Sequence, residues 1–228
     1  MFFSSGLDND TGLTSYWKFN GNANDSVGSN NGTSVNMNYV LGGLIGGVSA
    51  NFSNSGISYI TVPDSDTLSF DSDFSIVCLL FLNNTTSTPR IYNKRNSSSD
   101  FEYILIYQAN RLIALKDNLN GGILRTSATD AVPLSNWFVS TVTFNASTGT
   151  LKQYINKNLN NTVNNTGTFV AMENTTAPLV IGIDSVDLSS GNISGAINAL
   201  GIYKGKELTS LEVEANVDKF LIDNEHLI

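Results

Sequence analysis

The sequence predicts an all-β protein, a sandwich of two antiparallel sheets with one short helix near the C-terminus. Segments rich in β-branched and aromatic residues recur about every 8–12 residues, separated by clusters of Asn, Gly, Ser and Asp. Within many segments apolar and polar side chains alternate, as they do in strands with one buried face. Hydrophobic residues form 41% of the 228 residues, which is enough apolar material for one domain with one core.

Period-two alternation is clear in the first half of the chain. In residues 13–20, Ser15, Trp17 and Phe19 share a face that can be buried, whereas Tyr16 belongs to the face that meets water. The same alternation predicts strands at 48–53, 57–62 and 101–108. Each of these strands is expected to cover the core with one face only.

The middle of the chain carries a different pattern. Residues 74–82 are apolar on both faces, which predicts a central strand covered on each side, or one whose outer face packs under a loop or a partner. The single cysteine, Cys78, is expected to be a small buried hydrophobe there. Later strands are predicted at 137–145, 151–156, 179–183 and 196–203. Residues 145–149 would close a hairpin between the first two of these, with Gly149 at positive φ.

One helix is predicted near the C-terminus. Thr209 and Glu212 fit a capping box, and an apolar stripe would follow, made by Leu211, Ala215, Val217, Phe220 and Leu221. Because about three turns of helix are marginal alone, this helix is expected to pack on the sandwich. The predicted organisation is therefore an N-terminal tail at residues 1–12, one domain at 13–222 and a C-terminal tail at 223–228.

The charge and residue counts exclude several partners and chemistries. A net charge of −8 and a pI near 4.5 argue against nucleic acids and acidic membranes, because phosphate recognition depends on clustered Lys and Arg. No segment reaches the length of a transmembrane helix, so no membrane insertion is expected. One cysteine and one histidine, His226, cannot build an intramolecular disulfide, a Cys/His zinc site or a Cys-His dyad.

A set of motifs follows in a characteristic order. They are an aromatic strand at 13–20 followed by Asp25-Ser26-Val27-Gly28, a glycine-rich bend at 42–48, Tyr59-Ile60-Thr61-Val62-Pro63, Asp73-Phe74-Ser75-Ile76, Asn136-Trp137-Phe138-Val139, a hairpin at 149–157, and a closing strand at 195–203 with the helix at 208–214. This order resembles the laminin-G-like (LamG-like jelly roll) domains of the concanavalin A-like lectin/glucanase superfamily. Val139 and Lys157 depart from that family's pattern. The resemblance implies a concanavalin A-like jelly roll over nearly the whole chain.

The resemblance also implies a calcium site. Many relatives bind Ca²⁺ near the Asp-Ser-x-Gly loop, and Asp25, Asn30 and Asn198 stand at the matching positions. Asn198 replaces an Asp that the family often has, so one anionic ligand is missing and weaker affinity is expected. The alternative interpretation is that Asp25 only shapes an Asx turn.

Glycan recognition is a further expectation for this fold class. Aromatic rings that stack on sugars and polar groups that bind hydroxyls would form such a site. The candidates, on or beside the middle strands, are Tyr92, Asn93, Arg95, Tyr103 and Tyr107. Each of these residues can equally belong to the core or its rim.

No catalytic residues are predicted. The Glu-x-Asp-x-x-Glu strand of the glucanase branch does not occur, and Asp71 with Asp73 or Glu212 with Glu214 are expected to be solvated or capping groups. A Ser-His-Asp triad would have to recruit His226 from a tail. A glycoside hydrolase is therefore the least favoured function.

Two non-catalytic functions remain open. One is a bacteriophage virion protein, such as a capsid decoration or tail component, that contacts other virion or surface proteins; an Asn-rich, Lys-poor composition and the lack of a signal peptide favour it. The alternative is a carbohydrate-binding adhesin or lectin, and both hold if a virion part binds glycans. The expected location is the virion, made in the host cytoplasm, or else the cell surface or extracellular space.

Overall fold

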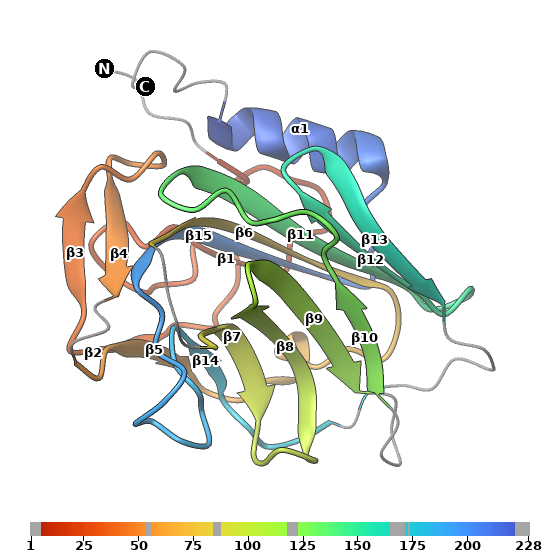
Figure 1. The fold of residues 1–228 in the computed structure, drawn as a ribbon, viewed down its shortest axis with the longest axis horizontal. Coiled ribbons are helices and arrows are strands. Elements are labelled where there is room, and N and C mark those ends of the chain that lie inside the picture. Colours follow the sequence, from red (N-terminus) through yellow and green to blue (C-terminus); the bar gives the residue numbers. More distant parts are fainter. Residues whose placement is uncertain are drawn as a thin grey trace.

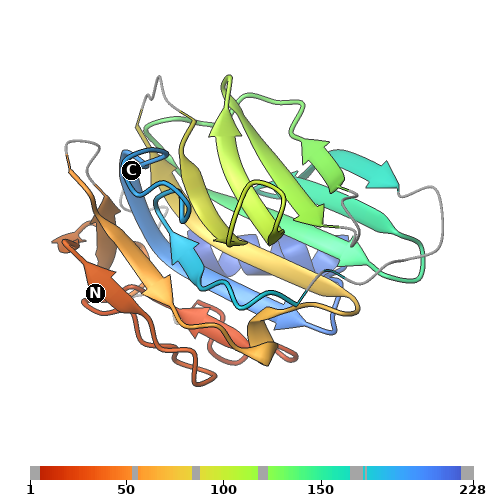
Figure 2. The same ribbon diagram turned by 90° about the horizontal axis from the view of Figure 1, so that it is seen from below.

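The computed structural model describes residues 6–52, 56–83, 88–117, 123–164, 172 and 174–221. It shows two antiparallel β-sheets packed face to face, with one helix, α1 (Ser210–Leu221), on the outer side of the larger sheet (Figure 1). Seen from below, the smaller sheet lies in front and α1 lies behind both sheets (Figure 2). The predicted β-sandwich with a short C-terminal helix is confirmed.

The two sheets contain eight and seven strands. The larger sheet has the order β13 (Asn158–Asn164), β12 (Thr150–Ile155), β11 (Trp137–Asn145), β6 (Phe74–Leu82), β15 (Gly195–Lys204), β4 (Val48–Phe52) and β3 (Asn38–Leu41), and β1 (Ser15–Trp17) also pairs with β15. The smaller sheet has the order β10 (Ile123–Ser127), β9 (Arg111–Asp117), β8 (Phe101–Gln108), β7 (Arg90–Arg95), β14 (Leu179–Ile181), β5 (Tyr59–Val62) and β2 (Thr33–Val35). A short 3-10 helix, η1 (Asp66–Leu68), follows β5.

The main core fills the space between the sheets. Phe74 and Leu80 of β6 belong to the same buried cluster as Leu105 of β8 and Ile181 of β14. Phe70 stacks on Phe74 with ring centroids 4.5 Å apart, an arrangement that adds to the apolar area these rings remove from water. The predicted hairpin at 145–149 joins β11 to β12, and Gly149 in it has a φ of 66°.

Strand β6 is covered on both faces, as its sequence predicts. Its residues Val77 and Leu79 point away from the main core into a second apolar cluster, which also contains Val139 of β11. The predicted burial of Cys78 is confirmed, and burial raises the pKa of its thiol, because desolvation disfavours the thiolate. The larger sheet is therefore a central layer between the smaller sheet and α1.

Helix α1 begins with the predicted capping box. The backbone N–H of Thr209 donates to Glu212 Oε2 at 2.8 Å, and the N–H of Glu212 donates to Thr209 Oγ1 at 3.3 Å. These two bonds satisfy N–H groups that the first turn of a helix leaves without intrahelical partners.

The buried face of α1 differs from the predicted stripe at two residues, Leu211 and Ala215, which are both exposed. Val213, Val217 and Phe220, at i, i+4 and i+7, pack against the outer face of the larger sheet. Leu211 is 75% exposed, because it lies outside the face that those three residues share. The prediction that the helix packs on the sandwich is confirmed.

Residues 6–12 are part of the domain, so the predicted N-terminal tail is wrong for them. Leu7 is fully buried in the outer apolar cluster with Tyr16 and Phe220. Tyr16 is therefore buried as well, although alternation along 13–20 places it on the solvent side. A strand pattern cannot show that a helix and an N-terminal segment cover its outer face.

The remaining terminal segments, residues 1–5 and 222–228 with His226, lie outside the described residues. Within the described part of the chain, α1 and η1 are too short and too polar to cross a membrane.

Candidate functional site

A polar pocket lies between the N-terminal segment, the loop after β15 and helix α1. Its volume is about 200 Å³, and its lining residues are Asp10, Thr11, Lys206, Leu208, Glu212, Ala215, Asn216 and Lys219. The segment around Asp10 is held there by the burial of Leu7, so the same contact that orders the N-terminus also builds one wall of the pocket.

One side of the pocket is organised around the hydroxyl group of Tyr203. This hydroxyl donates to Asp10 Oδ2 at 2.7 Å and lies 3.1 Å from Asn216 Nδ2, which donates to it. Lys219 donates to the other oxygen of Asp10. Burial and the neighbouring carboxylate of Asp10 both raise the pKa of Tyr203, so the phenol stays neutral and keeps its proton for this bond.

The other side is organised around the ammonium group of Lys206. Its Nζ donates to Thr11 O at 3.0 Å and to Glu212 Oε1 at 2.7 Å, and lies 5.7 Å from the centre of the Tyr203 ring. The Lys206 bond and the N–H group of Thr209 lower the pKa of Glu212. Glu212 therefore remains a carboxylate at neutral pH.

Charges in the pocket are balanced. Lys206 and Lys219 offset Asp10 and Glu212, and Ala215 on α1 adds a small apolar surface. Closely spaced donors and acceptors beside such a surface suit a small neutral ligand with several hydroxyl groups. The sequence alone does not indicate this site, because it places Asp10 in a predicted tail and gives Glu212 only the role of a capping residue.

The structure explains Asp25 as an anchor for the loop it occupies. Its Oδ1 accepts backbone N–H groups from Tyr16, Val27 and Gly28 at 2.8, 3.1 and 2.9 Å. Its Oδ2 accepts the N–H of Asn30 at 3.1 Å. Both carboxylate oxygens are therefore already occupied by backbone donors, as in the alternative interpretation of an Asx-type turn.

The other two predicted calcium ligands belong to structural networks as well. Asn30 Nδ2 donates to Ser15 Oγ at 2.7 Å and to Thr67 Oγ1 at 2.8 Å. Asn198 Nδ2 donates to the carbonyl oxygens of Ile45 and Val48 and so holds the glycine-rich bend at 42–48 against β15.

These contacts do not fit calcium coordination by Asp25, Asn30 and Asn198. A Ca²⁺ ion needs several oxygen ligands directed at one point. Here the amide groups of Asn30 and Asn198 form hydrogen bonds to separate loops, and the carboxylate of Asp25 accepts backbone N–H groups. Among the residues that the structure describes, no group of three or more His, Cys, Asp or Glu side chains could hold a metal ion.

The five residues expected to contact glycans are buried. Tyr92, Tyr103 and Tyr107 are each at most 3% exposed and belong to the main core. The premise of exposed rings is therefore wrong for these tyrosines, because the strands that carry them turn this face toward the larger sheet. The alternative, core packing, describes them.

Asn93 and Arg95 hold the loop that follows β14. Asn93 Nδ2 donates to Ile183 O at 2.8 Å, and Arg95 forms a buried ion pair with Asp184. Burial raises the pKa of Asp184, but the Arg95 bond and the Val186 N–H outweigh it and lower the pKa.

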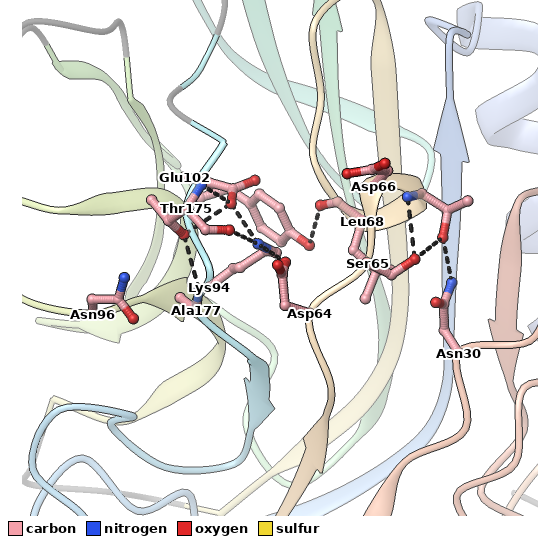
Figure 3. Close-up of polar contacts among 12 residues, drawn as sticks. Asn30, Asp64, Ser65, Asp66, Leu68, Lys94, Asn96, Glu102, Thr175 and Ala177 are labelled. Carbon is pink, nitrogen blue, oxygen red and sulfur yellow. Dashed lines mark hydrogen bonds and ion pairs between the residues drawn. The ribbon is translucent and has the colours of Figure 1, made fainter.

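A buried ionic cluster occupies one end of the smaller sheet (Figure 3). Lys94, fully buried, pairs with Glu102, lies 2.7 Å from Asp64 Oδ1 and donates to Thr175 O at 3.2 Å. The N–H and hydroxyl groups of Thr175 donate to Glu102 Oε1 at 3.0 and 2.9 Å. Burial raises the pKa of Glu102, and Lys94 opposes that effect. The cluster ties together β7, β8, the loop after β5 and the segment before β14.

The acidic residues considered for catalysis occupy loop and helix positions. Asp73 Oδ1 accepts the N–H of Ala146 at 2.6 Å and so holds the 145–149 hairpin, while Asp71 is exposed. Glu212 lines the pocket together with Asp10, and each of the two carboxylates is paired with a lysine.

The sequence also matches a known protein family. A family model described as the concanavalin A-like lectin/glucanases superfamily matches residues 54–214. The chain belongs to this family. The jelly-roll architecture expected from the sequence motifs is thereby confirmed, and no curated protein matches the chain.

Solved structures of binding domains share the fold of this superfamily member. Domain 4 of an extracellular GH43 arabinanase from Geobacillus stearothermophilus, in complex with arabinotriose, is 20% identical with a TM-score of 0.70, covering 90% of this chain and 98% of that one. The binding domain of Paraclostridial Mosquitocidal Protein 1 is 15% identical with a TM-score of 0.74, covering 94% of this chain. The botulinum neurotoxin serotype G binding domain is 18% identical with a TM-score of 0.70, covering 92%.

The extent of these matches differs. The present chain spans about half the length of the two toxin binding domains, 53% and 51% respectively, but nearly all of the arabinanase domain. At these identities the likeness shows a common fold.

Removing the Asp25 carboxylate should destabilise the protein without any dependence on calcium. Asp25→Ala leaves buried N–H groups unpaired and should lower the free energy of unfolding by about 3 kcal/mol. Urea denaturation measures this change, with the exposed Asp71→Ala as the control. The melting temperature of the wild type should be the same in calcium and in EDTA; a rise in calcium that Asp25→Ala abolishes would restore the ion site.

Breaking the buried ion pair should cost far more than breaking an exposed one. Lys94→Met leaves Glu102 buried without its cation and should lower the free energy of unfolding by about 3–5 kcal/mol. Adding Glu102→Gln should recover part of that loss, since the uncompensated charge is gone. Lys152→Met, which breaks the partly exposed pair with Glu207, should cost less than about 1 kcal/mol. Similar losses for Lys94→Met and Lys152→Met in urea denaturation would contradict this assignment.

Proposed function

We propose that this protein is a non-catalytic carbohydrate-binding module and that the pocket beside α1 receives the sugar. The observation that carries the proposal is the pocket itself, in which Lys206, Asn216 and Lys219 supply donors while Asp10 and Glu212 supply acceptors. Sugar recognition by relatives of this fold supports it: the arabinanase domain is described with arabinotriose, and cell entry of botulinum neurotoxin type C depends on gangliosides.

A neutral sugar fits the pocket better than an acidic one. The lysines are already paired with carboxylates, so no cation is left over for a ligand carboxylate or sulfate. The net charge of −8 also repels acidic glycans at longer range. Hydroxyl groups, in contrast, can both donate to Asp10 and accept from Asn216 without burying a new charge.

Filling the pocket should abolish sugar binding. Ala215 is an exposed residue of α1 that lines the pocket, so Ala215→Trp would place an indole in it without disturbing the helix core. A glycan array with neutral and acidic sugars, with and without EDTA, first identifies a ligand. Calorimetric titration with that ligand should then show affinity at least about tenfold weaker for Ala215→Trp.

The matched control is Leu211→Trp. Leu211 lies on the same helix, is 75% exposed and does not line the pocket, so this variant should bind like the wild type. An array without any reproducible ligand, or equal affinity in both variants, would argue against the pocket as the sugar site.

A second candidate function is a structural component of a virion, such as a capsid decoration or tail protein that contacts other virion or surface proteins. The absence of charged residues from 26–63, which provide β2 to β5, favours an assembly role, because these strands can form protein contacts without burying charges of their own. The location proposed with it is the virion, or alternatively the cell surface. Mass spectrometry of purified particles tests it, and absence of the polypeptide from them would exclude it.

A further inference from the structure

A continuous stretch of the chain carries no charge. Residues 26–63 contain no Asp, Glu, Lys, Arg or His, although the chain as a whole carries 32 Asp, Glu, Lys and Arg residues, 12 basic and 20 acidic. This stretch provides β2, β3, β4 and β5, which lie together at one side of the molecule, and β3 and β2 end the two sheets there (Figure 1). Copies of a protein with a net charge of −8 repel one another, so strands without charged residues are where two copies can pair at the lowest electrostatic cost.

Strand β3 has a free edge on this side. Among the strands that the structure describes it pairs with β4 only, with Val40 opposite Ser49. The N–H of Gly42 donates to Gly47 O, so by the alternation of an antiparallel ladder the backbone of Val40 also faces β4. The N–H and C=O groups of Tyr39 and Leu41 consequently point outward, away from β4.

This edge lacks the features that usually keep edge strands apart. Edge strands that avoid pairing with other chains usually carry lysine, proline or a β-bulge. Strand β3 has the sequence Asn-Tyr-Val-Leu, and it pairs with β4 without a bulge. Leu41 is 87% exposed and Val40 is 36% exposed. The hydroxyl of Tyr39 bonds Ser34 Oγ at 2.6 Å, which fixes the ring beside the strand.

The opposite edge strand of the same sheet, β13, is hydrogen-bonded to residues of the smaller sheet and its loops. Strand β13 is joined to the smaller sheet: Asn161 Nδ2 donates to Ser127 O at 2.7 Å, and Thr129 Oγ1 donates to Asn160 O at 2.9 Å. Its pairing with β12 also contains an irregularity at Gln153. Only one of the two ends of the larger sheet is therefore ready to accept another strand.

We propose that β3 is the dimerisation edge of this protein, pairing antiparallel with β3 of a second copy around a two-fold axis at Val40. Tyr39 of each copy then faces Leu41 of the other, and the four outward N–H and four outward C=O groups of these residues form four hydrogen bonds. Two copies of the same strand can therefore pair with each other, because antiparallel pairing about Val40 gives each outward N–H or C=O group a partner.

The dimer would have a consequence for binding. A two-fold axis perpendicular to the sheets keeps the outer faces of both larger sheets on the same side, and α1 lies on that face. Both pockets beside α1 would then face one way, so that a surface with repeated ligands could be bound twice. The pairing itself does not depend on the sugar-binding proposal.

Cross-linking tests the pairing register. At the two-fold axis the two Val40 residues form a non-hydrogen-bonded pair with Cα atoms about 4.5 Å apart, a separation that a disulfide can bridge. Val40→Cys should therefore give a covalent dimer under mild oxidation. The native Cys78 is buried and should not react. Leu159→Cys, on the opposite edge and 54% exposed, is the control and should stay monomeric on a non-reducing gel.

Analytical ultracentrifugation of the unmodified protein, from low to high micromolar concentration, gives the second readout. The wild type should be dimeric. Leu41→Lys should be monomeric, because it places a lysine of each copy against Tyr39 of the other and so adds two like charges to the paired edge. Leu159→Lys should remain dimeric. A wild type that is monomeric throughout would overturn the proposal. If the Leu41→Lys variant stays dimeric and Val40→Cys fails to cross-link, another surface forms the dimer. If the protein is monomeric and binds a different protein through β3, the edge belongs to a heterologous partner. Failure of the glycan array would leave these outcomes unchanged.

Discussion

The structure depends on burying strand β6 on both of its faces. Phe74, Ile76 and Leu80 face the smaller sheet, while Val77 and Leu79 face α1, so a third layer must cover the larger sheet. That requirement fixes the position of α1 and, through Leu7, of the N-terminal segment. Burial of apolar area is the main favourable term in folding, at about 25 cal/mol per Å², and a two-faced strand contributes with both faces. The pocket beside α1 is a by-product of this third layer.

Polar side chains in this protein mostly hold loops against that apolar framework. Asp25 collects backbone N–H groups, Asn198 fastens the glycine-rich bend, and Lys94 joins four segments at the end of the smaller sheet. A buried polar group must find partners, so each of these residues is fully engaged inside the fold. Residues that look like ligands or sugar contacts in the sequence are, for this reason, structural. The pocket and the edge of β3, in contrast, are accessible from outside the fold.

The proposed binding role and the proposed assembly role use different parts of the same sandwich. Two acidic and two basic side chains line the pocket, while residues 26–63, which provide β2 to β5, contain no charged residue. Such separation allows a domain to keep a polar recognition site and still present a surface on which a strand from another copy can pair. Membership of the concanavalin A-like superfamily fits this division, since the fold supplies a rigid framework and its edges and outer layers supply function.

The sequence by itself determined the period-two strands, the two-faced strand at 74–82, the hairpin at Gly149 and the capping box at Thr209, because these depend on neighbours along the chain. It also determined the family, through the order of its motifs. Only the tertiary structure decided that Tyr92, Tyr103 and Tyr107 face the core, that Leu7 and Tyr16 lie under α1, and that Asp10 meets Lys219 across the pocket. Alternation tells which residues share a face of a strand, but which face is covered depends on contacts between segments far apart in sequence.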